Sequence, residues 1–144
     1  MAISSRLPML SKEEISAFLA REFPQTKCVI ESLGDGEALL SHPVGEEELR
    51  PGGTVSGPVM MGLADVALYV ALFTRIGIVP LAVTTNLTTN FLRKPSGDRP
   101  ILARCRMIKV GRTQAVGEVS LYSEGSPEET IAHVVGTYAI PPRS

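Results

Sequence analysis

The sequence of 144 residues has no excess of positive charge and no block of basic residues. Its 14 lysines and arginines stand against 15 aspartates and glutamates, for a formal net charge of -1. Nucleic-acid binding needs clustered lysine and arginine to meet the phosphates, so we expect no nucleic-acid partner. The sequence also lacks a Walker-type or dinucleotide-binding glycine pattern, so nucleotide hydrolysis is not indicated.

Long apolar segments and cysteine motifs are missing as well. The longest apolar run, residues 58–73, has about 16 residues, which is short for a membrane span, and Asp65 lies in its middle. The first ten residues lack the apolar core of a signal peptide. Cys28 and Cys105 lie far apart and match no metal or redox spacing. We therefore expect a cytoplasmic protein with no membrane partner, no metal and two packed, reduced thiols.

What is present fits one soluble globular domain, with 44% hydrophobic and 20% charged residues. A chain of this length buries enough surface for one core, so residues 1–144 are expected to form a single domain. Ser11 and Glu14 form a capping-box pattern before an apolar face at helical spacing. This predicts an amphipathic helix over about residues 11–22, within an N-terminal helical extension of residues 1–26.

The next segment contains a hairpin signal and a loop. Residues 27–44 read as two short strands around Asp35 and Gly36, a dipeptide typical of tight hairpin turns. Residues 45–57 form a polar, glycine-rich loop. Its three consecutive glutamates, residues 46–48, are expected on a solvated surface.

The segment of residues 59–75 is apolar nearly all round, which predicts a helix buried on most sides. Gly57 is expected at its N-cap and Pro58 in its first turn, where the missing N–H of proline costs nothing. Gly77 follows its end, as a C-terminal glycine should.

After this helix the apolar period changes from 3.6 to 2. In residues 81–92, Val83 and Leu87 are expected on one face of a strand and Thr84 on the other. Three further strands are predicted, over residues 101–110, 113–122 and 129–140. Their short connections favour antiparallel pairing of neighbours. One curved antiparallel sheet is the only large element that can wrap the apolar helix, which predicts an α+β architecture.

Three stretches carry a resemblance to a known family: "GGTVSGPVMMGLADVALYVAL", "AVTTNLTTNFLRKP" and "KVGRTQAVGEVSLYSEGSPEETIAHVVGTYAI". Together they resemble the hot-dog-fold acyl-CoA thioesterases, most closely the phenylacetate-pathway type, over about residues 27–140. The resemblance implies a curved antiparallel sheet around a long central helix. It also implies a homodimer with sites between subunits, and dimers that pair into a homotetramer. The substrate would be an acyl-coenzyme A thioester, with no separate cofactor.

The resemblance implies catalytic roles for three residues. Asp65 matches an acidic position on the central helix, where it acts as nucleophile or as general base for water. The backbone N–H of Gly57 would polarise the thioester carbonyl as an oxyanion hole. Thr84 would orient the attacking water. The residues alone leave a structural alternative open for each: an aspartate hydrogen-bonded to the backbone, a glycine needed only for the turn, and a β-branched residue that suits a strand. In either role Asp65 needs partners, because an unpaired buried charge is costly.

Two positions depart from the family pattern. Ser56 stands where relatives have a histidine, and it cannot carry a proton near neutral pH. Arg50 stands where an Asn or Gln is frequent; it would replace the lost donor, hold the Asp65 carboxylate, or lie on the surface. Both departures count against efficient hydrolysis.

Cationic and apolar residues are candidates for binding the substrate. Cationic side chains beside exposed backbone N–H groups suit the phosphates of coenzyme A, although an ordinary solvated loop has the same composition. The candidates are Arg93, Lys94, Gly111 and Arg112. Met61 is expected to pack or to line an acyl pocket. His42 is expected in a surface loop and His133 within the last strand.

The sequence therefore predicts a thioesterase that hydrolyses medium-chain, long-chain or aromatic acyl-CoA to a free acid and CoA. The alternative is a hot-dog protein that binds acyl-CoA without cleaving it, which the residues at positions 50 and 56 favour. A hot-dog hydratase or dehydratase ranks last, because those relatives use a histidine with the carboxylate.

Overall fold

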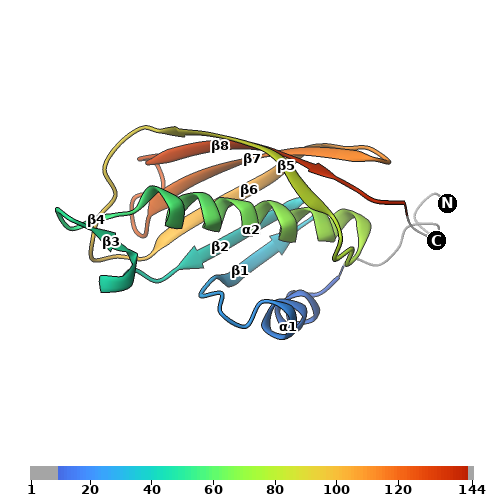
Figure 1. Ribbon diagram of the computed structural model, residues 1–144, viewed down its shortest axis with the longest axis horizontal. Coiled ribbons are helices and arrows are strands. Elements are labelled where there is room, and N and C mark those ends of the chain that lie inside the picture. Colours follow the sequence, from blue (N-terminus) through green and yellow to red (C-terminus); the bar gives the residue numbers. More distant parts are fainter. Residues whose placement is uncertain (1–9, 143–144) are drawn as a thin grey trace.

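The computed structural model describes residues 10–142, in which one large sheet curves around a long helix and a second helix lies beside it (Figure 1). The elements are α1 (Lys12–Glu22), β1 (Val29–Gly34), β2 (Glu37–His42), a 3-10 turn (Glu46–Glu48), β3 (Leu49–Arg50), β4 (Thr54–Val55), α2 (Gly57–Ile76), β5 (Val83–Phe91), β6 (Ile101–Val110), β7 (Gln114–Ser123) and β8 (Ala132–Ala139). The short ribbon of β3 and β4 lies in the segment expected to be only loop.

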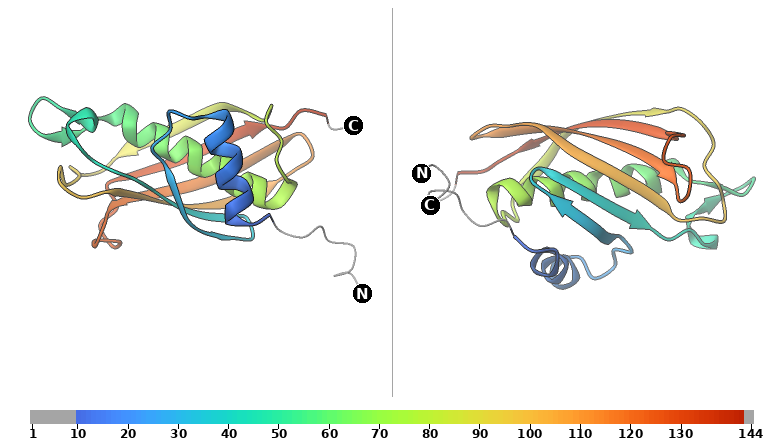
Figure 2. Two further views of the ribbon diagram at one scale, coloured as in Figure 1. Left: turned by 90° about the horizontal axis from the view of Figure 1, so that it is seen from below. Right: turned by 180° about the vertical axis from the view of Figure 1, so that it is seen from behind.

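The large sheet has six antiparallel strands in the order β1-β2-β6-β7-β8-β5. It curves around α2, and Figure 2 shows from behind how its strands cover that helix. The predicted α+β architecture and hot-dog arrangement are confirmed. The expectation that neighbours in the chain pair was wrong for β5, which pairs with β8 rather than with β6. The connection of residues 92–100 is long enough to pass the ends of two strands, so β5 becomes a sheet edge.

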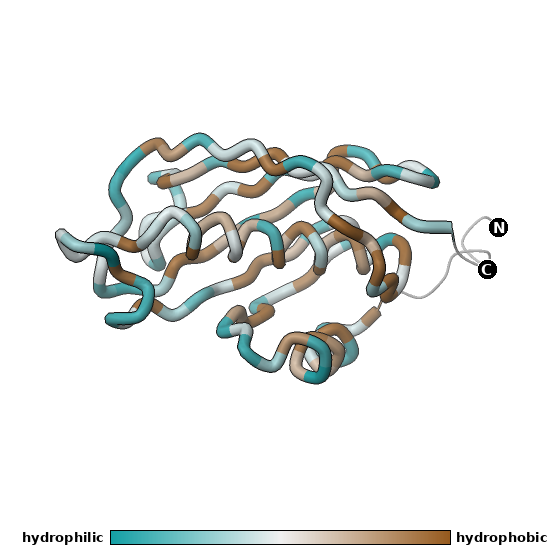
Figure 3. Tube along the Cα trace, in the orientation of Figure 1, coloured by the Kyte–Doolittle hydropathy of each residue, from teal (hydrophilic) through white to brown (hydrophobic). Residues whose placement is uncertain are grey.

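Helix α2 forms the centre of the core. Its buried residues are mostly apolar (Figure 3), and Leu68 packs against two glycines that pair across β7 and β8. A Cβ atom added at Gly136 would lie 2.4 Å from Cδ1 of Leu68, and one at Gly117 would lie 2.7 Å from Cδ2. The two glycines therefore allow the helix to approach the sheet closely.

Helix α2 has 20 residues and is longer than the apolar run of residues 58–73 noted in the sequence. By length and composition alone it could cross a membrane, with a mean hydropathy of 1.7 over an 18-residue window. However, 61% of that window is buried by this chain's own fold. A core helix wrapped by a sheet meets the same criteria, and that is the arrangement observed.

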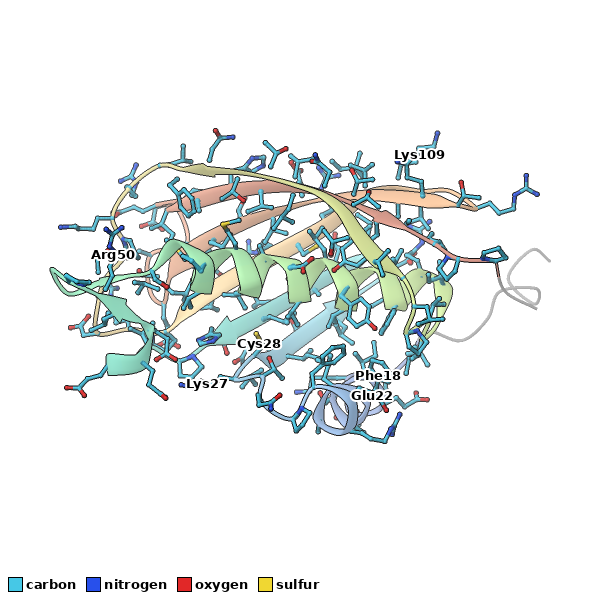
Figure 4. All side chains as sticks on the ribbon, viewed as in Figure 1. Phe18, Glu22, Lys27, Cys28, Arg50 and Lys109 are labelled. Atoms are coloured by element: carbon cyan, nitrogen blue, oxygen red, sulfur yellow. The ribbon has the colours of Figure 1, made fainter. Side chains whose placement is uncertain are left out.

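Helix α1 packs on the C-terminal half of α2 through aromatic rings. Its predicted capping box is confirmed, since Ser11 and Glu14 each accept a hydrogen bond from the other's backbone N–H. The ring of Phe18 lies 5.6 Å from that of Phe73 and 6.3 Å from that of Tyr69. Figure 4 shows Phe18 on the side of α1 that faces the body of the molecule.

Two polar residues lie elsewhere than expected. Glu48 is only 5% exposed, because it accepts hydrogen bonds from Lys27 Nζ at 2.7 Å and from the backbone N–H of Gly45 at 2.7 Å. The expectation of a solvated surface was wrong for this glutamate. His42 is the last residue of β2 rather than a loop residue, and it pairs with Ile101.

The predicted hairpin and the thiols follow expectation. Asp35 and Gly36 connect β1 and β2, and Gly36 has a φ of 72°. Both cysteines are free thiols: Cys105 is buried and Cys28 is half-buried. Burial raises the pKa of the Cys105 thiol to about 12, so this thiol stays protonated.

Candidate active site

The carboxylate of Asp65 projects from the middle of α2 and receives hydrogen bonds from two strands. The hydroxyl of Thr84 on β5 donates to Oδ1 at 2.7 Å. The hydroxyl of Tyr138 on β8 lies 2.7 Å from the same Oδ1 and 3.0 Å from the backbone carbonyl oxygen of Asp65. Within residues 10–142, the other carboxylate oxygen, Oδ2, accepts no hydrogen bond. The aspartate therefore has the partners that its apolar setting demands, and one oxygen stays available.

A bulge in β5 turns Thr84 toward Asp65. Thr84 lies opposite Tyr138 in the β5–β8 ladder, and the register shifts between Thr84 and Asn86. After the shift Leu87, rather than Asn86, is half-buried, while Val83 is 54% exposed. The strict alternation expected for this strand was therefore wrong, because one extra residue inverts the faces on either side of it.

Tyr138 was not singled out from the sequence, where it is one aromatic residue in an apolar strand. It is 3% exposed, and its ring lies 6.0 Å from that of Tyr69. Burial raises the pKa of the Tyr138 phenol well above its usual value, and the negative charge of Asp65 adds to this. The phenol therefore stays protonated near neutral pH and can donate its hydrogen bond.

An open cleft of about 450 Å³ leads to Asp65. Its walls come from α1 and the segment after it, from α2, from the segment before β5, and from the start of β5 and the end of β8. The lining residues other than Asp65, Thr84 and Tyr138 are Leu19, Phe23, Thr26, Val66, Tyr69, Pro80, Ala82 and Val83. The rings of Phe23 and Tyr69 meet edge-to-face at 5.9 Å, and the Tyr69 hydroxyl donates to the carbonyl of Pro80 at 3.0 Å. The cleft is mostly apolar with one carboxylate, which suits an acyl group beside a reacting carbonyl.

The start of α2 differs by one residue from the expectation. Ser56, rather than Gly57, is the N-cap, and its Oγ accepts a hydrogen bond from the backbone N–H of Val59 at 3.3 Å. Gly57 and Pro58 are the first two helical residues. The N–H of Gly57 belongs to the first turn, whose N–H groups have no acceptor inside the helix. A Cβ atom at Gly57 would lie 3.3 Å from the ring of Phe91, so this glycine also allows the end of β5 to approach.

Gly57 and Asp65 do not face one common point within a single chain. They are eight residues apart on one helix, which places them about 12 Å apart along its axis. Gly57 lies near Phe91 at the end of β5, whereas Asp65 bonds to Thr84 at its start. One chain therefore carries the two groups at opposite ends of β5.

The predicted phosphate-binding residues are divided in the same way. Gly111 and Arg112 lie in the tight turn between β6 and β7, close to the start of β5 in the sheet, since Gln114 and Val83 both pair with Ala139. Arg93 and Lys94 follow the other end of β5. Arg93 lies 3.7 Å from the carboxylate of Glu129, and both are exposed.

Two further candidates do not contact Asp65. Arg50 is exposed on β3, at the end of the molecule where α2 begins (Figure 4). Met61 is half-buried and does not line the cleft, while Met60 is in the core.

His133 lies within β8 as expected, and its Nε2 is 3.2 Å from Glu118. Among the described residues there is no group of three or more His, Cys, Asp or Glu side chains that could hold a metal.

The sequence matches the family model of the thioesterase superfamily over residues 52–130, which include α2, β5, β6 and β7. The chain belongs to the thioesterase superfamily. Thioester hydrolysis is therefore the activity class that the comparisons support, and superfamily members act on acyl thioesters and oligomerise. A comparison with curated proteins gave no match.

Solved structures of superfamily members have the same fold. A protein from Silicibacter sp. TM1040, provisionally assigned as a thioesterase, is 43% identical, with a TM-score of 0.86 over 96% of this chain and 97% of that chain. Zebrafish thioesterase superfamily member 2 has a TM-score of 0.81 at 21% identity, covering 92% and 99% of the two chains. A point mutant of the phenylacetic acid degradation protein PaaI from Thermus thermophilus has a TM-score of 0.71 at 25% identity, covering 87% and 99%.

Proposed function

We propose that this thioesterase-superfamily member hydrolyses acyl-CoA, with Asp65 as the reacting carboxylate in a site between two protomers. The observation that carries the proposal is the state of the Asp65 side chain. Two hydroxyl donors hold Oδ1, Oδ2 has no partner among residues 10–142, and the residue lines an apolar cleft. A carboxylate held in this way is oriented and reachable, as a base or nucleophile must be.

The reaction needs few groups. As a general base, Asp65 takes a proton from water while the water oxygen attacks the thioester carbonyl carbon. The C–S bond then breaks, the free acid forms, and the CoA thiolate leaves and takes up a proton. As a nucleophile, Asp65 would instead form an acyl anhydride with loss of CoA, and water would hydrolyse it. The Thr84 hydroxyl donates its proton to the Asp65 carboxylate. Its oxygen would therefore accept a hydrogen bond from the attacking water.

The separation of Gly57 and Asp65 supports a site completed by a second copy. The exposed edge of β5 can pair with the β5 edge of a second copy in antiparallel orientation. The start of one β5 then meets the end of the other. This brings the Gly57 N–H of one protomer toward the Asp65 carboxylate of its partner, so that both flank one carbonyl.

The same arrangement brings the basic residues together. In a single chain, the two ends of β5 are about 26 Å apart. Antiparallel copies would place Arg112 of one protomer near Arg93 and Lys94 of the other, around the phosphates of one CoA. We expect Arg112→Gln to raise KM for acyl-CoA several-fold with little change in kcat, and to weaken the salt dependence of KM. An unchanged KM would remove Arg112 from the binding site.

The deciding experiment measures release of free thiol from a panel of acyl-CoA substrates with medium-chain, long-chain and aromatic acyl groups. We expect turnover by the wild type and a loss of at least about 100-fold in Asp65→Asn. Asp98→Asn is the matched control, because Asp98 lies in the loop after β5 with its side chain 87% exposed. No release from any of the substrates by the wild type would contradict the proposal. Trapping experiments in oxygen-18 water would distinguish nucleophile from general base.

The oligomeric state can be measured independently of activity. We expect a homodimer built on the β5 edge, and pairing of dimers into a homotetramer, as the family resemblance implies. Light scattering gives the mass. Thr88→Pro would remove a β5 backbone donor and would shift the mass toward the monomer if the β5 edge is the interface. An unchanged mass in a folded variant would point to another interface.

A second candidate function, binding of acyl-CoA without hydrolysis, is favoured by the role of Ser56. Its hydroxyl caps α2 and cannot carry a proton at neutral pH, so this position gives no acid to the leaving group. Thermal stabilisation by a non-hydrolysable acyl-CoA, without thiol release from the matching thioester, would support this function over catalysis.

A further inference from the structure

We infer that Tyr138 is a positioning residue for Asp65: it holds Oδ1 and thereby assigns the reacting role to Oδ2. The inference rests on the proposed function, since it concerns how that carboxylate is aimed. It adds a residue to which neither the sequence patterns nor the family resemblance assigned a role.

The geometry is specific to one oxygen. Thr84 and Tyr138 are partners in the β5–β8 ladder, and both hydroxyls reach Oδ1 at 2.7 Å. A carboxylate has two nearly equivalent oxygens and turns about its last torsion at low cost. Two donors on Oδ1 prevent this rotation of the carboxylate, and they leave Oδ2 on the side away from both hydroxyls.

Tyr138 also ties the side chain of Asp65 to the helix backbone. The same phenol oxygen lies 3.0 Å from the carbonyl oxygen of Asp65 and 2.7 Å from Oδ1. One hydroxyl proton is thus shared between two acceptors of a single residue. This arrangement restricts the rotamer of Asp65 as well as the rotation of its carboxylate.

A tyrosine suits this position because the phenol combines a buried ring with a single donor. The ring packs beside Tyr69 at 6.0 Å, and the residue is 3% exposed. Phenylalanine would keep the packing of the ring and remove only the donor. Tyr138→Phe therefore separates positioning from packing.

The kinetic test compares Tyr138→Phe with Tyr122→Phe. Tyr122 is a buried tyrosine of β7 whose hydroxyl lies 3.4 Å from Arg104, away from the cleft. We expect Tyr138→Phe to lower kcat by about 10-fold to 100-fold, with KM changed by less than about 3-fold, because a misaimed carboxylate slows chemistry more than binding. We expect Tyr122→Phe to keep both constants within about 2-fold. An unchanged kcat in Tyr138→Phe would overturn the inference while leaving the proposed function intact.

A double variant is a second readout that a purely structural tyrosine would not move. Combining Tyr138→Phe with Thr84→Val should give less than the sum of the two separate effects in ΔΔG‡, because both donors act on one oxygen.

A measurement without turnover tests the inference if the proposed activity fails. The carboxyl carbon of Asp65, assigned by its loss in Asp65→Asn, is observed by carbon-13 NMR at neutral pH. Its chemical shift should change in Tyr138→Phe and stay in place in Tyr122→Phe, because only the first variant loses a donor to Oδ1. An unchanged shift in Tyr138→Phe overturns the inference. If Tyr138→Phe does not fold, the resonance of the Tyr138 hydroxyl proton should move in Asp65→Asn, and a resonance that does not move overturns the inference.

Discussion

Thr84 and Asp65 are 19 residues apart in the chain, and their side chains meet in a hydrogen bond of 2.7 Å. The contact joins the middle of the central helix to the start of an edge strand. It exists because a bulge in β5 turns Thr84 inward, opposite Tyr138.

We expect Thr84→Val to lower kcat about 10-fold, because a hydrogen bond to a charged group contributes about 1.5 kcal/mol and valine keeps the shape without the donor. Thr84→Ser should retain most of the activity. Steady-state kinetics with the best acyl-CoA substrate provide the measurement. Thr84→Ser is therefore the control, and an equal loss in both Thr84 variants would argue for a general effect on the strand.

Gly136→Ala should destabilise the protein by about 1–3 kcal/mol, the cost of overpacking a filled core. The added methyl group would lie 2.4 Å from Cδ1 of Leu68 and 3.0 Å from Cδ1 of Leu87. Denaturant unfolding measures the difference. Gly45→Ala is the control, because its added methyl group would make only an ordinary contact of 3.5 Å with Glu48. Equal stability of the Gly136 variant and the wild type would mean that helix and sheet are not held at this distance.

Ser56→Ala should lower the free energy of unfolding by about 1 kcal/mol, because it removes the side-chain cap of α2. Ser56→Asp should restore stability, since aspartate is also a good N-cap and its charge suits the helix dipole. The comparison separates capping from catalysis. If activity falls in both variants while stability falls only in Ser56→Ala, the hydroxyl has a role beyond capping.

Glu48→Gln should reduce stability at neutral pH but not in acid. Hydrogen bonds from Lys27 and then from the Gly45 N–H lower the pKa of the Glu48 carboxyl below its usual value of 4.5. Its ionised form therefore stabilises the fold above pH 4.5, and this contribution is lost as the pH falls through the lower, folded-state pKa. In thermal unfolding from pH 7 to pH 3, the difference in Tm between wild type and Glu48→Gln should shrink below about pH 4.5. The exposed Glu46→Gln should show no such trend.

Much of the fold could be predicted from local patterns. The capping box of α1, the turn at Asp35 and Gly36, and the apolar residues of α2 each depend on neighbours in the chain. Their physical causes act over a few residues, so the sequence displays them directly. A sheet wrapped around α2 could then be predicted, because a helix that is apolar nearly all round must be buried on most sides.

The errors arose where distant segments meet. The bulge at Thr84 interrupts an alternation that looked regular, and Glu48 is buried only because Lys27 and Gly45 come to it. Neither event leaves a local pattern, since both depend on the register and packing of other elements. The pairing of β5 with β8, rather than with β6, is of the same kind.

The sequence by itself determined that a lone aspartate lies in an apolar helix and therefore needs partners, because an isolated charge in that setting is costly. Only the tertiary structure decided which partners these are. Thr84 and Tyr138 reach the same oxygen because β5 and β8 pair in one register over one face of α2. A register is a property of the assembled sheet, and no residue of Asp65's own segment encodes it.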